Sequence, residues 1–125
     1  MDIGPAESDK IYAAYSGTVV EYVNTYPNDF RCYDDTKMES YGNYVIIETV
    51  IDGRTYHMRY AHMQYGAPVF NGKTVQAGFC IGKAGSTGRT DRGDGSPYIH
   101  LHFEVMTWDE YGNKIWVNPL DLLSY

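Results

Sequence analysis

Two histidines separated by a single leucine stand near the end of the chain, in segment 100–105, which reads HLHFEV. On a β-strand, successive side chains point to opposite faces, so His100, His102 and Glu104 would share one face and the apolar residues the other. Residues two apart on a strand lie roughly 6.5 Å apart, so both imidazoles can reach one small site. The pattern suits a metal ligand beside a general base, and equally an ordinary half-buried strand with a polar outer face.

A hairpin is the clearest local signal elsewhere in the chain. Asp52-Gly53 separates two β-rich runs, residues 44–51 and 54–62. This dipeptide indicates a two-residue turn, because both central positions of such a turn want positive φ. The turn then fixes which residues face each other across the hairpin. The expected pairs are Ile51 with Arg54, Glu48 with His57, Ile47 with Met58, and Val45 with Tyr60.

The two histidines of this hairpin fall on different faces in that register. His62 ends the apolar face and is expected to point toward the core or a cleft in it, as a satisfied core histidine or as a site residue. His57 is expected on the more polar face, beside Glu48 and Arg59, in a structural or solvated role. The apolar face is expected to hold Val45, Ile47, Met58 and Tyr60, and the polar face also Tyr44 and Ile46.

The remaining segments are read as short strands joined by turns. The expected strands are residues 10–14, 17–23, 74–75, 79–81, 105–108 and 115–117, with a single helical turn over 118–123. The long polar connection 24–42 is either the rim of a groove or a passive surface insertion. The glycine-rich loop 82–95 is not read as a phosphate cradle, because no Gly-Lys-Ser/Thr ending and no helix pattern follow it.

Composition limits the class of protein. With 125 residues, 43% apolar and 21% charged, and with 13 glycines and 13 tyrosines, the chain is expected to be one globular, turn-rich, all-β domain. No apolar run approaches the ~20 residues of a membrane span. The net charge of −6 without a basic cluster argues against binding to nucleic-acid phosphates or to an anionic surface.

The first residues and the cysteines give little information on where the protein acts or on its disulfides. The first five residues have neither a basic segment nor an apolar core, so any export signal is expected outside this chain. Cys32 and Cys80 could form one disulfide or remain two thiols, and two cysteines alone give no zinc ribbon.

Several segments occur in an order that is specific as a set, although each is weak alone. They are Asp2-Ile3-Gly4, Tyr12 to Ala14, Ser16 to Val20, Gly42 to Ile47, Tyr60 to Met63, Val75 to Gly78, Ile81-Gly82, Gly85 to Gly88, His100 to Val105, and Asn118 to Leu120. The chain thereby resembles, over essentially its whole length, the lysostaphin/LytM-type zinc metalloendopeptidases. The resemblance implies an antiparallel β-sheet or sandwich domain of the duplicated hybrid motif type, with a substrate groove and minimal helix.

The same resemblance implies a site. One zinc ion would be held by the His and Asp of a His-x-x-x-Asp motif and by the second His of His-x-His, so Asp2 and His102 match metal ligands. His100 and His62 match the two catalytic histidines. His100 would take a proton from the attacking water, and His62 would hold the water or the developing oxyanion. Glu104 would either orient His102 or be a solvated carboxylate.

Two departures from the family pattern stand out. The first histidine of His-x-x-x-Asp would lie three residues before Met1, and a strand upstream of it is likewise missing. We therefore expect residues 1–125 to be a single domain without these parts. With two of three ligands, residues 1–125 are expected to bind zinc weakly and to have little or no peptidase activity. The long loop 88–99 replaces a short link and leaves the substrate preference open.

Two functions follow from the resemblance. One is a cell-wall enzyme outside the cytoplasm, secreted or associated with the envelope, that cleaves peptide cross-links of bacterial peptidoglycan. The other is a non-catalytic LytM-like module that binds cell-wall peptide or a partner protein. Retention of the four site residues favours the enzyme. A biotinyl- or lipoyl-type carrier fails for want of a lysine at a hairpin tip. An exposed sheet edge also predicts a homodimer formed by strand addition.

Overall fold

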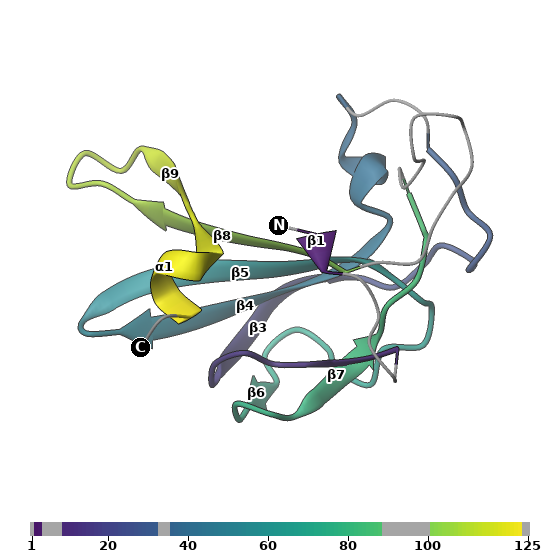
Figure 1. The fold of residues 1–125 in the computed structure, drawn as a ribbon, viewed down its shortest axis with the longest axis horizontal. Helices are drawn as coiled ribbons and strands as arrows, with labels where there is room; N and C mark the ends of the chain where they lie inside the picture. The colour runs from purple at the N-terminus through teal and green to yellow at the C-terminus, as the bar shows by residue number, and fades with distance from the viewer. Residues whose placement is uncertain (1, 4–8, 33–35, 89–100, 124–125) are drawn as a thin grey trace.

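The computed structural model describes residues 2–3, 9–32, 36–88 and 101–123. These residues form two antiparallel sheets with little helix, as Figure 1 shows, so the expected all-β fold is confirmed. The elements are β1 (Asp2–Ile3), β2 (Lys10–Tyr12), β3 (Gly17–Val23), η1 (Met38–Tyr41), β4 (Asn43–Ile51), β5 (Arg54–Met63), β6 (Thr74–Val75), β7 (Cys80–Lys83), β8 (Leu101–Trp108), β9 (Lys114–Val117) and α1 (Pro119–Leu123).

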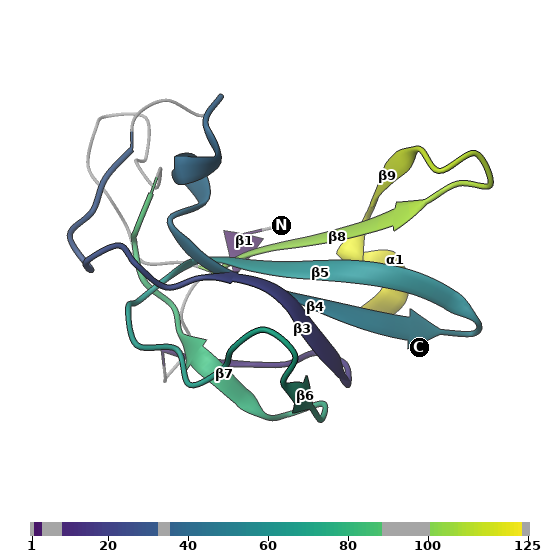
Figure 2. The same cartoon turned by 180° about the vertical axis from the view of Figure 1, so that it is seen from behind.

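The larger sheet is built around the β4–β5 hairpin. Its strand order is β1-β8-β5-β4-β3-β6, with β9 also paired to β8, and β2 and β7 form a separate two-stranded sheet. From both sides, β3, β4, β5 and β8 lie next to one another, while β7 and α1 lie toward opposite ends of the molecule (Figures 1 and 2). This order places β8, which carries His102, directly beside β5, which carries His62.

The Asp-Gly turn sets the register of the hairpin as predicted. Asp52 has φ 52° and Gly53 has φ 79°, the two positive values that a two-residue turn of this kind needs. All four predicted pairs are present, from Ile51 with Arg54 to Val45 with Tyr60. Because side chains alternate along each strand, this register sends one set into the core and the other to the opposite face.

The main core covers one face of the larger sheet. The small sheet contributes Ile11 and Ile81, and α1 contributes Leu122. The larger sheet contributes Val19, Val45, Ile47, Met58, Tyr60, Phe103 and Val105. The opposite face holds a smaller apolar cluster of Tyr44, Ile46 and Ala61, packed against Val23 and Tyr41. This second face also carries polar side chains, next to the small apolar cluster.

Most of the other predicted elements are also present. The turn around Gly112 (φ 81°) joins β8 to β9, and a helical turn closes the described chain at 119–123.

Cys32 is buried and Cys80 is half-buried, and both are thiols rather than a disulfide. No helix among the described residues is long and apolar enough to cross a membrane. Of the loop 88–99, all residues after Gly88 lie outside the described ranges, so the prediction for this loop stays a prediction.

Candidate active site

Strand pairing brings three site positions into one row. Asp2 of β1 is the register partner of His102 of β8, and His102 is in turn the partner of Ala61 of β5. His62 follows Ala61 in the chain, and its ring centroid lies 5.8 Å from that of His102. The backbone of Asp2 and the rings of two histidines thus meet where β1, β8 and β5 run side by side. His100 lies outside the described residues.

A β-bulge explains how His62 reaches this position. Between the pairs Val45–Tyr60 and Asn43–Met63, β5 has two residues where β4 has only one. His62 takes φ 59°, a left-handed value that is uncommon for a residue with a side chain. The side chain is buried, as expected, with 6% of the residue exposed. The prediction that it continues the apolar face is wrong, because the bulge turns the ring toward His102 on the opposite face.

A backbone carbonyl fixes which nitrogen His62 presents. Its Nδ1 lies 2.8 Å from the Thr87 carbonyl oxygen. Since a carbonyl only accepts hydrogen bonds, Nδ1 must donate, and the neutral ring then carries its lone pair on Nε2. The Thr87 side chain is fully buried, donates to the Met63 carbonyl (2.8 Å) and accepts from the Asn43 N–H (3.1 Å). Sequence reasoning missed this residue, and its only signal was the Gly-Ser-Thr-Gly segment.

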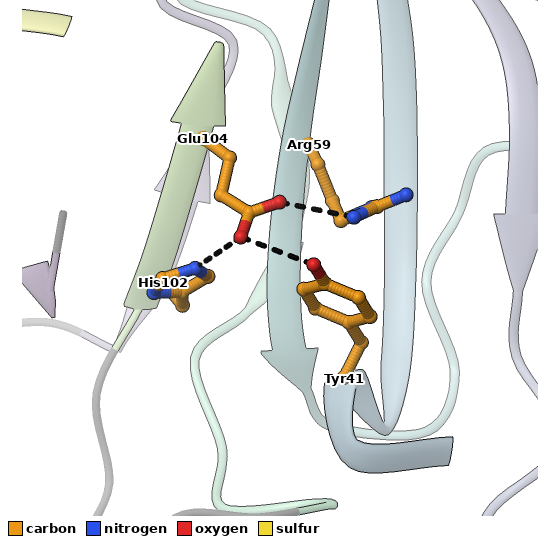
Figure 3. A network of polar contacts seen from close by, with 4 residues as sticks. All are labelled: Tyr41, Arg59, His102 and Glu104. Atoms are coloured by element: carbon orange, nitrogen blue, oxygen red, sulfur yellow. Dashed lines mark hydrogen bonds and ion pairs between the residues drawn. The ribbon is translucent and has the colours of Figure 1, made fainter. Parts of the chain in front are cut away.

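A second network orients His102, as Figure 3 shows. Its Nε2 lies 2.6 Å from Oε1 of Glu104. The Tyr41 hydroxyl donates to the same oxygen (3.2 Å), and Nη1 of Arg59 donates to Oε2 (2.9 Å). Only 14% of the Glu104 side chain is exposed. The alternative of a solvated carboxylate is therefore wrong, and Glu104 contacts His102 as an orienting residue would.

The charges around Glu104 favour its ionised form. Burial alone would raise the pKa of the Glu104 carboxyl, but the hydrogen bond and charge of His102, the charge of Arg59 and the Tyr41 hydroxyl lower it below its ordinary value. Burial, and then the negative charge of Glu104, raise the pKa of Tyr41, so that its hydroxyl stays protonated and donates. The carboxylate is consequently an acceptor that is held by three donors.

His57 lies apart from this cluster, as predicted. Its Nε2 is 2.9 Å from Oε2 of Glu48, and its ring meets the edge of Trp108 at 4.7 Å between centroids. On β5 it stands four residues before Ala61, opposite Met106. It is therefore a structural residue of the sheet surface.

The described residues fit part of a zinc site. No group of three or more His, Cys, Asp or Glu side chains that could hold a metal is found among them. The imidazole of His102 has an arrangement typical of zinc ligands, because one of its nitrogens faces a carboxylate that fixes the orientation of the ring. An imidazole and a carboxylate are both ordinary zinc ligands, so His102 and Asp2 are a chemically suitable pair.

Comparisons with known proteins identify proteins to which this chain is similar. The sequence profile of peptidase family M23 matches residues 1–119. The catalytic domain of the antimicrobial peptidase lysostaphin from Staphylococcus simulans is similar at 25% identity and a TM-score of 0.66, over 99% of this chain and 77% of that one. A longer lysostaphin structure gives 25% identity and 0.64, over 98% of this chain and 42% of the other.

A further solved structure shares the fold. It is a putative glycyl-glycine endopeptidase LytM from Ruminococcus gnavus, with 22% identity and a TM-score of 0.68, over 98% of this chain and 44% of that chain. At this identity the likeness concerns the fold alone. A comparison with curated proteins found no match.

Proposed function

The chain belongs to peptidase family M23, and from that premise we propose that it is a zinc endopeptidase domain that hydrolyses peptide cross-links of bacterial peptidoglycan. The observation that carries the proposal is the 5.8 Å approach of the His62 and His102 rings in the row where Asp2 pairs with His102. The similarity to lysostaphin, an antimicrobial peptidase, supports the same class of reaction.

In this proposal Asp2 and His102 hold the zinc ion, His102 through Nδ1 because its Nε2 faces Glu104. Residues 1–125 then supply two of the three protein ligands that a catalytic zinc takes. By the spacing of His-x-x-x-Asp, the third would be a histidine three positions before Met1. When bound, zinc polarises the scissile carbonyl and lowers the pKa of a bound water toward ~7.

His62 and His100 are the proton-transfer groups in this proposal. His62 donates Nδ1–H to Thr87, so its neutral ring offers Nε2 as an acceptor for a water proton. Once protonated, the same nitrogen becomes a donor that can stabilise a developing oxyanion. His100 is proposed as the second proton-transfer group, on the basis of the His-x-His motif. The burial of His62 limits competing contacts with bulk water.

The proposed substrate and location follow from the reaction. A peptide cross-link with small residues such as Gly or Ala at the scissile bond is the substrate class that we favour. Peptidoglycan lies outside the cytoplasmic membrane, so the protein would act there, either secreted or associated with the envelope.

A hydrolysis assay tests the proposal. Residues 1–125 preceded by His-Ala-Gly, which restores His-x-x-x-Asp, should release amino groups from purified peptidoglycan in the presence of zinc. His102→Ala and His62→Gln should abolish the release, whereas His57→Gln should retain it. No release by the His-Ala-Gly chain would contradict the enzyme, and co-sedimentation with peptidoglycan without release would favour the non-catalytic binding module.

A further inference from the structure

Arg59 is buried in a way that packing does not explain. Only 7% of its side chain is exposed, and its Nε has no hydrogen-bond partner among the described residues. Burying a charge is unfavourable unless it is well paired, and apolar residues of similar volume commonly replace buried ion pairs without loss of stability. The position faces an apolar cluster that contains Tyr44, so a methionine could fill it. The arginine is therefore expected to have a role other than stability.

The residues around Arg59 hold its guanidinium group against one oxygen of Glu104. Its guanidinium carbon lies 4.1 Å from the centroid of the Tyr41 ring and 5.1 Å from that of Tyr44, distances at which cation–π attraction holds the group in place. Its Nη1 donates to Oε2 of Glu104. Tyr41 donates to Oε1, the oxygen that also meets His102. With both oxygens held, the carboxylate is expected not to rotate away from the imidazole.

We propose that Arg59 and Tyr41 are positioning residues for His102, on which they act through Glu104. The inference deepens the proposed function and rests on it in one respect, namely that His102 is a zinc ligand. An ionised carboxylate only accepts hydrogen bonds, so Nε2 of a neutral His102 must be the protonated nitrogen. The lone pair is then on Nδ1, the nitrogen assigned to zinc. Figure 3 shows the side chains of Tyr41, Arg59 and His102 converging on the Glu104 carboxylate.

The network also joins the site to the long loop. Tyr41 belongs to η1, which lies within the connection 24–42, whereas Arg59 is on β5 and both His102 and Glu104 are on β8. The loop thus contributes a side chain that contacts two members of the network. This contact favours the prediction that the connection is the rim of a groove over the alternative of a passive surface insertion.

Nuclear magnetic resonance of the metal-free chain tests the proposal. With ¹⁵N-labelled histidine, long-range ¹H–¹⁵N correlation distinguishes the Nε2–H from the Nδ1–H tautomer, and only four histidines need assignment. At about pH 8, above the usual histidine pKa of ~6.5, His102 should be the Nε2–H tautomer. Arg59→Met should convert it to a mixture of both tautomers and weaken zinc binding by about 10- to 100-fold.

Arg54→Met is the control for the loss of an arginine from β5. Arg54 is on the same strand and also lies over a tyrosine ring, that of Tyr56 at 6.0 Å, but it donates to Thr107 rather than to Glu104. This variant should leave the His102 spectrum unchanged. If Arg59→Met does not fold, Tyr41→Leu, at a half-exposed position, should produce the same mixture by releasing Arg59 and Oε1 together.

Two results would overturn the proposal. One is a His102 that is the Nδ1–H tautomer in the unsubstituted chain, and the other is a folded Arg59→Met or Tyr41→Leu variant with an unchanged tautomer. The tautomer readout needs neither zinc nor hydrolysis. A chain with the expected tautomers and no peptidase activity would therefore contradict the proposed function while supporting the positioning role.

Discussion

One hydrogen bond to each of two histidines of the proposed site determines which ring nitrogen carries the proton and which carries the lone pair. His62 is held at Nδ1 by a carbonyl, and His102 is held at Nε2 by a carboxylate. The two rings therefore use opposite nitrogens for support, and their remaining nitrogens are the ones proposed for chemistry. The family resemblance placed His62 and His102 in one site, which remains a proposal. It did not indicate which of their nitrogens are hydrogen-bonded, because Thr87 and Arg59 lie 25 and 43 positions away from them in the sequence.

His62→Asn separates support from chemistry. Asparagine tolerates the left-handed backbone of this position, and its amide can still donate to the Thr87 carbonyl, so the free energy of unfolding should change by less than about 1 kcal/mol. Without Nε2, peptidase activity of the His-Ala-Gly chain should fall by about 10²- to 10⁴-fold. Urea unfolding and the amino-group assay measure the two effects. Activity that stays near the original level would show that His62 has no proton-transfer role.

Tyr60→Phe tests the buried hydroxyl of the core. Burial raises the pKa of Tyr60 to about 12, whereas an unfolded tyrosine titrates near 10. The stabilising effect of the protonated form is complete below pH 10 and is lost as the pH rises toward 12, because only the unfolded chain ionises freely there. This loss should amount to roughly 2–3 kcal/mol.

The Tyr60→Phe variant should lack the loss of unfolding free energy that the ionisation of Tyr60 causes at alkaline pH. At neutral pH it should be about 1 kcal/mol less stable, because the Ala14 N–H loses its 2.9 Å bond to the hydroxyl. Urea unfolding at pH 7 and across the alkaline range makes the comparison. An identical pH dependence of the two proteins would contradict the assignment.

At the scale of elements, the sequence predicted the regular parts of the sheet and not its irregularity. Asp52-Gly53 fixed the β4–β5 register, since the turn type leaves no other pairing. Nothing in the local pattern signals the bulge near His62, because alternation assumes an unbroken ladder. Tyr41 was likewise out of reach, because its approach to Glu104 depends on the path of the loop and not on any period in the sequence.

Gly88 should be intolerant of a side chain. A β-carbon there would lie 2.4 Å from the Ser40 carbonyl oxygen and 2.5 Å from the Gly42 nitrogen, with φ at +84°. Gly88→Ala is expected to cost the backbone strain of about 1 kcal/mol and a further 1–3 kcal/mol of overpacking. The neighbouring Thr87 should shift, so the His62 resonances should shift too.

Gly53→Ala is the control for this prediction. It has a similar φ of +79°, but no atom lies within 4 Å of the added carbon. It should cost only the backbone strain and leave the His62 resonances unchanged. Equal losses of unfolding free energy in the two variants would show that the contact of Gly88 with Ser40 and Gly42 is unimportant.

For the whole molecule, the all-β fold followed from the pattern of short strands and from the family resemblance. One apolar face of the larger sheet is covered by the small sheet and α1, and the other face carries the site. Neither periodicity nor composition indicated which strands would be neighbours. The order β1-β8-β5 joins opposite ends of the chain, and that order brings together the positions of Asp2, His62 and His102, the residues of the proposed site.

Self-association remains a prediction at this scale. β1 is two residues long and ends the described path of the larger sheet, and an edge strand presents backbone groups that another chain can pair with. Light scattering at high protein concentration should give the mass of a dimer. A monomeric mass at every concentration would contradict it.

Zinc titration tests the central claim, that Asp2 and His102 are two ligands of a three-ligand site. The chain preceded by His-Ala-Gly should bind one zinc ion at least about 100-fold more tightly than residues 1–125 alone or than a chain preceded by Ala-Ala-Gly. His102→Ala should remove the gain. Sub-micromolar one-to-one binding by residues 1–125 alone, lost on His102→Ala, or no gain from the added histidine, would contradict the claim.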